Sequence, residues 1–303
     1  MIKTPMSGII APVVTAFHQN CEIDFERSIA HCRWLLEHGC DRLVVFGTTS
    51  EGNSLSLVER KRLLEAIVSS GISPAQLLVG NGSCALPDAV DLAIHALQAG
   101  CDHVLMLPPF YYKAVSVDGL FAFFAEFIDR VADPRLHVYL YHIPPVAQVG
   151  IPLALLEKLS ARYGSLIAGI KDSSGDWENT RRLLTERADI QVFPGSEAFL
   201  LPALRLGAAG CISGTANVGA ETMQLLYQNR ETAEAEEIQS RLNRVREVFQ
   251  RYPMIAAVKA VLAVANDDDN WRYVRPPLLR LPDVDSQVLV RELERLKFEP
   301  PKF

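Results

Sequence analysis

The sequence predicts an α/β fold, a (β/α)8 TIM barrel followed by a C-terminal helical extension. Three features of the 303-residue chain lead to this prediction: eight short apolar runs, a segment with helical spacing after each run, and an exclusively helical pattern from about Thr232 onward. Parallel strands need crossover connections of this length, and near-continuous apolar strands are expected where both faces of a sheet are covered. Eight such units favour a closed barrel. An open doubly wound sheet is the alternative, but no G-x-G-x-x-G follows the first run, as a dinucleotide-binding fold would require.

The eight apolar runs are expected strands because they are short and rich in Val, Ile and Leu. In chain order they are GIIAPVVTAF near Ile10, DRLVVFG ending at Gly47, QLLVGNG at Leu78, DHVLMLP at Leu105, LHVYLYH at Tyr139, LIAGIKD at Ile170, IQVFPGS at Val192 and AGCISG at Ile212. The segments between them carry apolar residues three and four positions apart, which predicts helices. These expected helices span residues 25–38, 57–70, 88–99, 118–131, 153–161, 180–186, 197–206 and 220–228.

The last part of the chain has no strand pattern. AEAEEIQSRLNRVREVF, PMIAAVKAVLAVA and SQVLVRELERLKF all have helical spacing, with a Pro-rich turn before the last. We therefore expect a catalytic barrel over residues 1–230 and a helical appendage over 231–303. NDDDN, at residues 266–270, lacks the spacing of a helix-loop calcium site and is expected to be a solvated connection.

Composition favours a small-molecule partner over nucleic acid. The formal net charge is −6, and the 30 Lys and Arg residues are scattered among 36 acidic residues, so no basic stripe is present. The first residues, MIKTPMSGII, lack a long apolar run with a cleavage site, and no later stretch reaches about 18 uninterrupted apolar residues. We expect a cytoplasmic protein that does not enter a membrane.

The cysteines and histidines indicate neither disulfides nor a metal. The six cysteines form no C-x-x-C pair and have no histidine at zinc-finger spacing, so buried reduced thiols are expected. They are Cys21, Cys32, Cys40, Cys84, Cys101 and Cys211. The seven histidines form no H-x-H pair and no other close cluster along the chain, which disfavours metal-dependent chemistry.

In a barrel of this kind the active site lies where strands meet the following helices. The second strand ends in GTTSEGNSL, which places Gly47, Thr48 and Thr49 in a turn before a helix near Ser56. Hydroxyls and backbone N–H groups in such a turn hold a carboxylate or relay a proton. The alternative is an ordinary helix entry with capping hydroxyls.

The sixth strand ends in GIKDSSGDW, so Lys171 occupies the last position of an expected barrel-lining strand. Apolar walls disfavour the charged ammonium and favour the free amine, which attacks a ketone carbonyl. The alternative is that Lys171 forms an ion pair with Asp172 or Asp176 at the rim.

Two further strand ends carry aromatic residues. The fifth strand ends in YLYHIPP, where Tyr139 and Tyr141 share one face and His142 points away from the lumen. A phenol beside an amine moves protons to and from carbinolamine and enamine intermediates, although a barrel tyrosine is more often a packing residue. The fourth strand ends in PPFYYK, whose exposed aromatics indicate either an interface or a lid over the barrel.

Taken in order, GTTSE, PPFYYK, YHIPP, GIKDSSGD and PGSEAFLLPALRLGAAGCISGTANV resemble the dihydrodipicolinate synthase and N-acetylneuraminate lyase family of class I, Schiff-base aldolases. The resemblance runs nearly from end to end. Five motifs lie in the family's order at family-like spacing, and Lys171 falls on the family's Schiff-base position.

The resemblance implies a role for each residue of this set. Lys171 would form the imine with pyruvate or a pyruvate-like 2-oxo acid, and Tyr141 would be the acid/base residue beside it. Thr48 would relay protons, and Thr49 with its backbone N–H would bind the substrate carboxylate. The Ile212 carbonyl would lie against the bound keto acid.

The resemblance also implies an assembly. Tyr111, in preference to Tyr112, would be contributed across a dimer interface to the neighbouring subunit's proton relay. Family members are commonly homotetramers built as dimers of dimers, and we expect a homotetramer here. No cofactor and no metal are expected, because the protonated imine itself is the electron sink.

Two departures from the family concern the second substrate. Dihydrodipicolinate synthases have an arginine five positions after the catalytic tyrosine, which supports a carboxylate-bearing aldehyde; here that position is Val146. Sialic acid lyases present an Asp–Glu pair after the seventh strand, and here only Glu197 stands there, after Ser196. Ser173, Ser174, Ser196 and Glu197 would then offer hydroxyls and one carboxylate to a hydroxylated or aromatic substrate tail.

We therefore expect a lyase that catalyses aldol cleavage or condensation between a 2-oxo acid and an aldehyde. A Schiff-base dehydratase of a 2-keto-3-deoxy sugar acid, dihydrodipicolinate synthase proper, and a non-catalytic 2-oxo-acid-binding barrel are the alternatives. The last is disfavoured because Lys171, Tyr141, Thr48 and Thr49 are all present. A phosphate cradle at GCISGTANVG would be a further alternative, although a tight turn beside the keto acid explains its glycines better.

Overall fold

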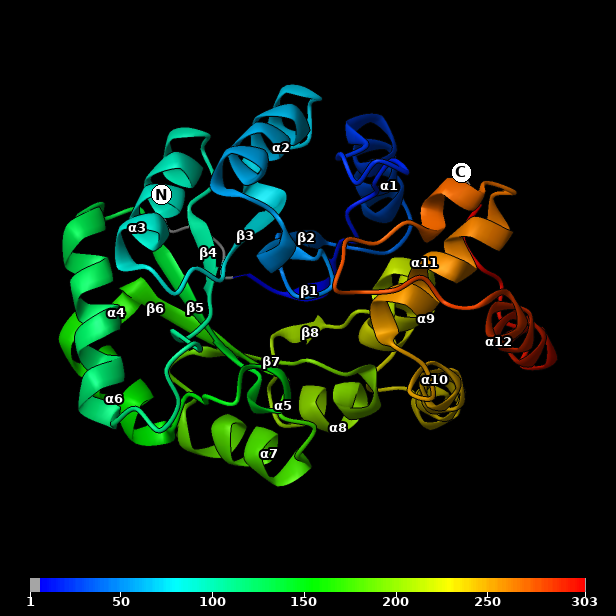
Figure 1. The fold of residues 1–303 in the computed structure, drawn as a ribbon. Coiled ribbons are helices and arrows are strands. Elements are labelled where there is room, and N and C mark those ends of the chain that lie inside the picture. The colour runs from blue at the N-terminus through cyan, green and yellow to red at the C-terminus, as the bar shows by residue number, and fades with distance from the viewer. Residues whose placement is uncertain (1–5, 303) are drawn as a thin grey trace.

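The computed structural model describes residues 6–302 and has the predicted TIM barrel (Figure 1). Eight parallel strands pair in the order β7-β6-β5-β4-β3-β2-β1-β8. They are β1 (Gly8–Pro12), β2 (Arg42–Val45), β3 (Leu77–Asn81), β4 (His103–Met106), β5 (His137–His142), β6 (Ile167–Asp172), β7 (Gln191–Pro194) and β8 (Gly210–Ile212). The Ala209 N–H donates to the Val192 carbonyl at 3.0 Å, so the barrel nearly closes between β7 and β8. Residues 1–5, the first half of the N-terminal run MIKTPMSGII, lie outside the described residues.

Helices surround the barrel and continue beyond it (Figure 1). They are α1 (Phe25–Glu37), α2 (Leu57–Ser69), α3 (Leu86–Gln98), α4 (Val117–Val131), α5 (Pro144–Ala147), α6 (Leu153–Tyr163), α7 (Trp177–Glu186), α8 (Leu200–Arg205), α9 (Ala216–Gln228), α10 (Ala235–Phe249), α11 (Met254–Ala265) and α12 (Asp283–Arg295). Every helix predicted for the barrel has a counterpart at closely similar bounds.

Three local differences from the sequence prediction have clear causes. The helix predicted at 197–206 is divided into a 3-10 turn, η4 (Glu197–Phe199), and α8. Helix α7 begins at Trp177 rather than at residue 180, because the Asp176 carboxylate caps it by accepting from Glu178 N–H at 2.9 Å. The short helix α5 was not predicted, because four residues are too few to show helical spacing; its two leading prolines occupy positions where a helix tolerates them.

Alternate strand residues form two separate apolar layers. Ile10, Leu105, Tyr139 and Tyr141 belong to the buried cluster inside the barrel, as the shared face of the two tyrosines predicted. His142 points the other way, since its Nδ1 accepts from Ile151 N–H outside the barrel at 2.8 Å.

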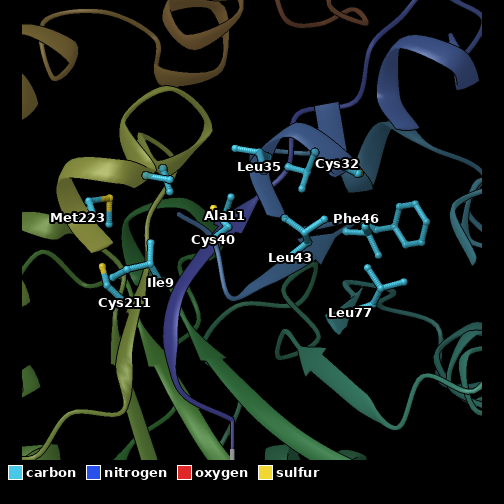
Figure 2. Packing of buried hydrophobic residues seen from close by; sticks show 14 of the residues in the cluster. Ile9, Ala11, Cys32, Leu35, Cys40, Leu43, Phe46, Leu77, Cys211 and Met223 are labelled. Carbon is cyan, nitrogen blue, oxygen red and sulfur yellow. The ribbon is translucent and has the colours of Figure 1, made fainter. Parts of the chain in front are cut away.

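The outer layer packs the strands against the surrounding helices. Figure 2 shows part of it, in which Ile9, Leu43 and Leu77 from three neighbouring strands pack with Leu35 of α1. Removing these side chains from water is the main favourable term for the barrel. Barrel and helices are therefore stabilised together.

The C-terminal helices share a hydrophobic core with the barrel. Val14, after β1, and Val218, in α9, belong to one cluster with Val258 of α11 and Leu289 of α12. In Figure 1 α11 lies beside α9, and α12 lies beside α11 and α10 at the outer edge of the molecule. Within residues 6–302 no single helix is long and apolar enough to cross a bilayer, and α10 with α11 meets that criterion only as a pair bent by 104°.

A buried ion pair also ties the two parts together. Lys259 of α11 donates from Nζ to Glu51 Oε1 at 2.5 Å, and both side chains are completely buried. Lys259 Nζ also donates to the Tyr273 carbonyl at 2.7 Å, and Arg275 N–H donates to Glu51 Oε2 at 2.9 Å. Glu51 follows Thr48 and Thr49, so the turn that carries these threonines is fastened to the C-terminal segment.

The cysteines are free, and the prediction that they are buried holds for four of the six. Cys32, Cys40, Cys101 and Cys211 are buried, whereas Cys21 and Cys84 are only half-buried. Burial raises the pKa of Cys32 and of Cys101 to about 12, which keeps both thiols protonated and unreactive at neutral pH.

Candidate active site

A cavity of about 580 Å³ opens at the carboxyl end of the strands. Its floor, as we use the word, consists of residues at the ends of β2, β5, β6 and β8: Thr48, Thr49, Tyr141, Lys171 and Ile212. Its mouth consists of the remaining lining residues, which come from the loops and from the C-terminal segment. Such a position is where barrel enzymes carry their chemistry.

Lys171 lies on the floor, only 4% exposed. Its Nζ donates to the Tyr141 phenol oxygen at 3.1 Å, and the parallel register of β5 and β6 places these two residues side by side. The alternative of a rim ion pair is wrong. Asp172 instead accepts from the hydroxyl of Thr180 at 2.7 Å, and Asp176 caps α7.

Tyr141 connects Lys171 to the β2 loop. Its phenol oxygen lies 3.4 Å from Thr48 Oγ1, and Lys171 Nζ lies 4.2 Å from the centre of its ring. Burial opposes ionisation of this phenol, but the Lys171 charge and hydrogen bonds from Thr48, Lys171 and Ser173 outweigh burial and lower its pKa below the ordinary value of 10. Tyr141 is therefore better able to give up its proton than an isolated tyrosine.

The loop after β2 is a tight turn held by its own backbone. The Glu51 N–H donates to the Thr48 carbonyl at 3.0 Å, and the Gly52 N–H donates to the Gly47 carbonyl at 3.0 Å. Thr48 and Thr49 line the cavity. Gly47 is not among the lining residues, and its carbonyl helps to close the turn; the expectation that Gly47 binds substrate stays a prediction.

Glu197 is a predicted contact that the structure places elsewhere. Its carboxylate is buried and accepts from the hydroxyls of Ser213 at 2.5 Å and Thr215 at 2.6 Å. The cause is local: the Ser196 hydroxyl accepts from Ala198 N–H at 3.3 Å, and the resulting 3-10 turn directs Glu197 towards the end of β8 rather than into the cavity. The predicted contact between Glu197 and a substrate is therefore wrong, and Glu197 instead positions Ser213.

Ser173 and Ser196 do line the cavity, as expected. Ser173 also bears on Tyr141, because its hydrogen bond favours the ionised phenol. A Cβ at Gly195 would overlap the Ser173 side chain, so a glycine is required there for Ser173 to keep its place. Ser174 does not line the cavity, since its hydroxyl accepts from Asp176 N–H at 3.1 Å.

The mouth contains residues that the sequence analysis missed. These are Ile143 and Pro145 after β5, Phe199 after β7, Gly214 after β8, Arg246 in α10, Pro253, Met254, Ile255 and Ala256 at the start of α11, and Pro277, Leu278 and Leu279 before α12. The available signal was the RPPLL motif, whose adjacent leucines have no helical or strand pattern to bury them. Leu279 is in fact 81% exposed.

Tyr111 and Tyr112 lie on the surface, 74% and 73% exposed, with their rings 5.3 Å apart edge to face. Neither lines the cavity. The alternative of a lid folded over its own barrel is therefore wrong. An interface role for these rings stays a prediction.

The structure brings together two histidines that are far apart in the sequence. His103 and His137 stack with ring centres 5.0 Å apart at the starts of β4 and β5, and Asp102 Oδ1 lies 2.6 Å from His103 Nδ1. The absence of a histidine cluster along the chain did not foresee this pair, which is formed by the β4–β5 register. This group lies at the amino end of the strands, away from Lys171, and takes no part in the cavity.

Comparison with known proteins agrees with this geometry. The profile of the dihydrodipicolinate synthetase family matches residues 5–296. An uncharacterized DapA-like lyase from Chloroflexus aurantiacus is 33% identical, over 95% of this chain and 96% of that protein. The 4-hydroxy-tetrahydrodipicolinate synthase of Bacillus subtilis is 30% identical, over 95% of this chain and 99% of that protein.

Two solved structures share the whole fold. Dihydrodipicolinate synthase from Agrobacterium tumefaciens has a TM-score of 0.87 at 33% identity, covering 95% of this chain and 99% of its own. YagE from E. coli, a family protein solved in complex with pyruvate, has a TM-score of 0.88 at 26% identity, covering 96% and 99%.

Proposed function

Because the chain belongs to the dihydrodipicolinate synthetase family of DapA-like lyases, we propose that Lys171 forms a Schiff base with pyruvate or a similar 2-oxo acid and that the enzyme cleaves or forms an aldol bond. The single observation that carries this proposal is the contact between Lys171 Nζ and the Tyr141 phenol, 3.1 Å apart on the floor of the cavity. An amine buried beside a phenol of lowered pKa is what imine chemistry requires.

In the proposed reaction the Lys171 amine attacks the ketone carbon, and the carbonyl oxygen leaves as water. Tyr141 supplies and removes the protons of this step, and Thr48, 3.4 Å away, passes them on. The protonated imine then takes up the electron pair of the breaking C–C bond, and Tyr141 removes the proton of the hydroxyl on the cleaved carbon. Thr49 with its backbone N–H binds the carboxylate, and the Ile212 carbonyl lies against the keto acid.

Pyruvate is the first choice of keto acid. YagE, which shares this fold at 26% identity, was solved in complex with pyruvate. The Lys171 end of the cavity is lined by the polar side chains of Thr48, Thr49 and Tyr141, which suits a small 2-oxo acid. The aldehyde half of the substrate would occupy the mouth.

The position of Val146 disfavours dihydrodipicolinate synthase proper. Val146 lines the mouth and is 64% exposed, where an arginine would serve an aldehyde that carries a carboxylate on this wall. Expulsion of a hydroxide from the same enamine would make the enzyme a dehydratase. Product analysis separates the two reactions, because only aldol cleavage releases pyruvate and an aldehyde.

We also propose a homotetramer built as a dimer of dimers, with Tyr111 reaching the neighbouring subunit's relay. The exposed pair Tyr111 and Tyr112 supports this assembly, because large exposed aromatics mark interfaces. Tyr111→Phe should lower turnover while the assembly mass, measured by light scattering, stays that of wild type. Full activity in this variant would remove Tyr111 from the relay.

The test of the central proposal is intact-protein mass after incubation with pyruvate and borohydride. A gain of about 72 Da is expected, the mass of pyruvate joined as an imine and then reduced. Lys171→Ala should show no gain, and Lys158→Ala, which removes an exposed lysine on α6, should gain the same mass as wild type.

The contrary result is as informative. If wild type gains no mass with pyruvate or with larger 2-oxo acids, Lys171 is not a Schiff-base lysine and the barrel is a binding protein. If Lys171→Ala gains the same mass as wild type, another amine is the nucleophile.

A further inference from the structure

Arg246, in α10, is a cation at the mouth of the cavity whose hydrogen bonds use only one corner of its guanidinium. Nη1 lies 3.3 Å from Ser213 Oγ and 3.4 Å from Glu197 Oε2. Nε is buried and has no hydrogen-bond partner among the described residues. Because Nε has no accessible surface, a group in the cavity would reach the guanidinium through Nη2, which makes no hydrogen bond among the described residues.

Glu197 does not account for this arginine. Its two carboxylate oxygens already accept from Ser213 and Thr215 at 2.5 and 2.6 Å, which are the distances of strong hydrogen bonds to a carboxylate. The approach of Arg246 is nearly 1 Å longer, at 3.4 Å. Glu197 therefore holds Nη1 in place and leaves Nη2 available to donate to a group in the cavity.

Asp172 also lines the cavity, but its carboxylate already accepts from Thr180 Oγ1 at 2.7 Å and from Asn179 Nδ2 at 3.0 Å, and most of the rest of the mouth is apolar. Its walls are Ile143, Pro145, Val146, Phe199, Pro253, Met254, Ile255, Ala256, Pro277, Leu278 and Leu279. Ser173 and Ser196 offer only two hydroxyls between these walls and the floor. A polyhydroxylated tail would lose its water without finding enough partners, whereas a hydrocarbon or aromatic group would be well accommodated.

These walls also strengthen the interaction of Arg246 with an anion. The Arg246 side chain is 17% exposed, so a partner there would be largely withdrawn from water. In such surroundings a charge-assisted hydrogen bond is stronger than on a surface. The cation lies on the α10 side of the mouth, while Val146 occupies the β5 side.

We propose that the aldehyde half of the substrate carries an apolar or aromatic group ending in a carboxylate, and that Arg246 binds this carboxylate through Nη2. This inference rests on the proposed function, because it takes the floor to hold the 2-oxo acid. Arg246 would then determine which aldehyde the enzyme accepts. It would distinguish this enzyme from lyases whose aldehyde half is an uncharged sugar.

The experiment uses the borohydride-reduced pyruvate adduct, in which the floor is occupied and a free carboxylate no longer binds at Thr49. Benzoate and benzamide, which have nearly the same shape and differ in charge, are titrated into this adduct by calorimetry. Benzoate should bind more tightly than benzamide by roughly ten- to a hundredfold, the range for a hydrogen bond to a charged group.

Arg246→Met keeps most of the apolar stem and removes the donors. In its reduced adduct the preference for benzoate should fall to within about twofold, since the remaining walls are neutral. Arg244→Met is the matched control, because Arg244 is an exposed arginine on the same helix and does not line the cavity. It should keep the wild-type preference.

The outcomes distinguish the two proposals. If wild type forms the adduct but binds benzoate and benzamide equally, the carboxylate subsite is refuted and the Schiff-base function stands. If Arg246→Met no longer forms the adduct, Arg246 is a positioning residue for Ser213 and Glu197 and the subsite is refuted as well. If wild type forms no adduct, the proposed function fails, and this inference fails with it.

Discussion

The floor and the mouth of the cavity come from different parts of the chain and differ in chemistry. The floor is made by strand ends, is deeply buried, and is joined by the contacts between Lys171, Tyr141 and Thr48. The mouth is made by loops and by the C-terminal segment, is mostly apolar, and has one cation, Arg246, among its lining residues within the described chain. In the proposed function, reaction chemistry would thus reside at the strand ends, and substrate choice in the loops and the appended segment.

This division has a physical basis. A strand end is fixed by the hydrogen bonds of its neighbours on both sides, so Tyr141 and Lys171 are aligned by the β5–β6 register alone. The mouth has no such constraint. Its residues vary with loop sequence, which is how one barrel serves many substrates.

The largest expected effect is at the floor. Tyr141→Phe should lower kcat by roughly a hundred- to ten-thousandfold, the usual contribution of a positioned acid or base. The loss should be the same for every aldehyde, because Tyr141 acts on the keto acid side. Tyr139→Phe is the control, since Tyr139 lies in the same lumen but donates to Gln191 at 2.5 Å, away from Lys171. A loss in Tyr141→Phe that depended strongly on the aldehyde would contradict the separation of floor from mouth.

The sequence was sufficient for the floor because its signals are local. Lys171 stands out as a cation ending an apolar run, and the position of Tyr141 two residues after Tyr139 places both in the lumen. The fold was predictable for the same reason, since eight strand-helix repeats are each recognisable within about 30 residues.

The mouth was not predictable, because its contacts join distant segments. Glu197 was expected to face the substrate, yet its partners, Ser213, Thr215 and Arg246, lie 16 to 49 positions further along the chain. Nothing within a short window shows that a helix after the barrel returns to that carboxylate. The appendage was expected at residues 231–303, but its role as a cavity wall depends on packing that a one-dimensional pattern does not contain.

The second effect concerns the buried ion pair that joins the loop after β2 to the C-terminal segment. Lys259→Met leaves Glu51 as a buried charge without its cation and should lower the free energy of unfolding by roughly 3 to 5 kcal/mol, measured by urea denaturation. Lys158→Met is the matched control: the Lys158–Asp118 pair is equally short at 2.5 Å but exposed, so its loss should cost about 1 kcal/mol or less. Equal losses in the two variants would show that burial is not what makes the Lys259 pair matter.

The smallest expected effect is a pH dependence of the free energy of unfolding, arising where α1 packs against the C-terminal segment. His31 of α1 packs edge to face against Trp271 of the C-terminal segment, with ring centres 5.3 Å apart, and its Nε2 lies 3.1 Å from Asn217 Oδ1. Burial lowers the pKa of His31 to about 4, and the hydrogen bond with Asn217 only partly opposes this shift. The unfolded chain, with an ordinary histidine pKa of 6.5, therefore binds more protons between pH 6.5 and 4.

Stability from this group is present above pH 6.5 and is lost as the pH falls towards 4. At pH 5 the loss relative to pH 7 should be about 2 kcal/mol, from about 1.4 kcal/mol for each pH unit below 6.5. His31→Gln has no titrating ring, so its unfolding free energy should fall by about 2 kcal/mol less than that of wild type between pH 7 and pH 5. The comparison of slopes, rather than of absolute stabilities, removes any packing defect that the substitution causes against Trp271. If the unfolding free energies of wild type and His31→Gln changed equally with pH, His31 would protonate without cost in the folded protein. The contact between the barrel and the C-terminal segment would then open to water more readily than its packing indicates.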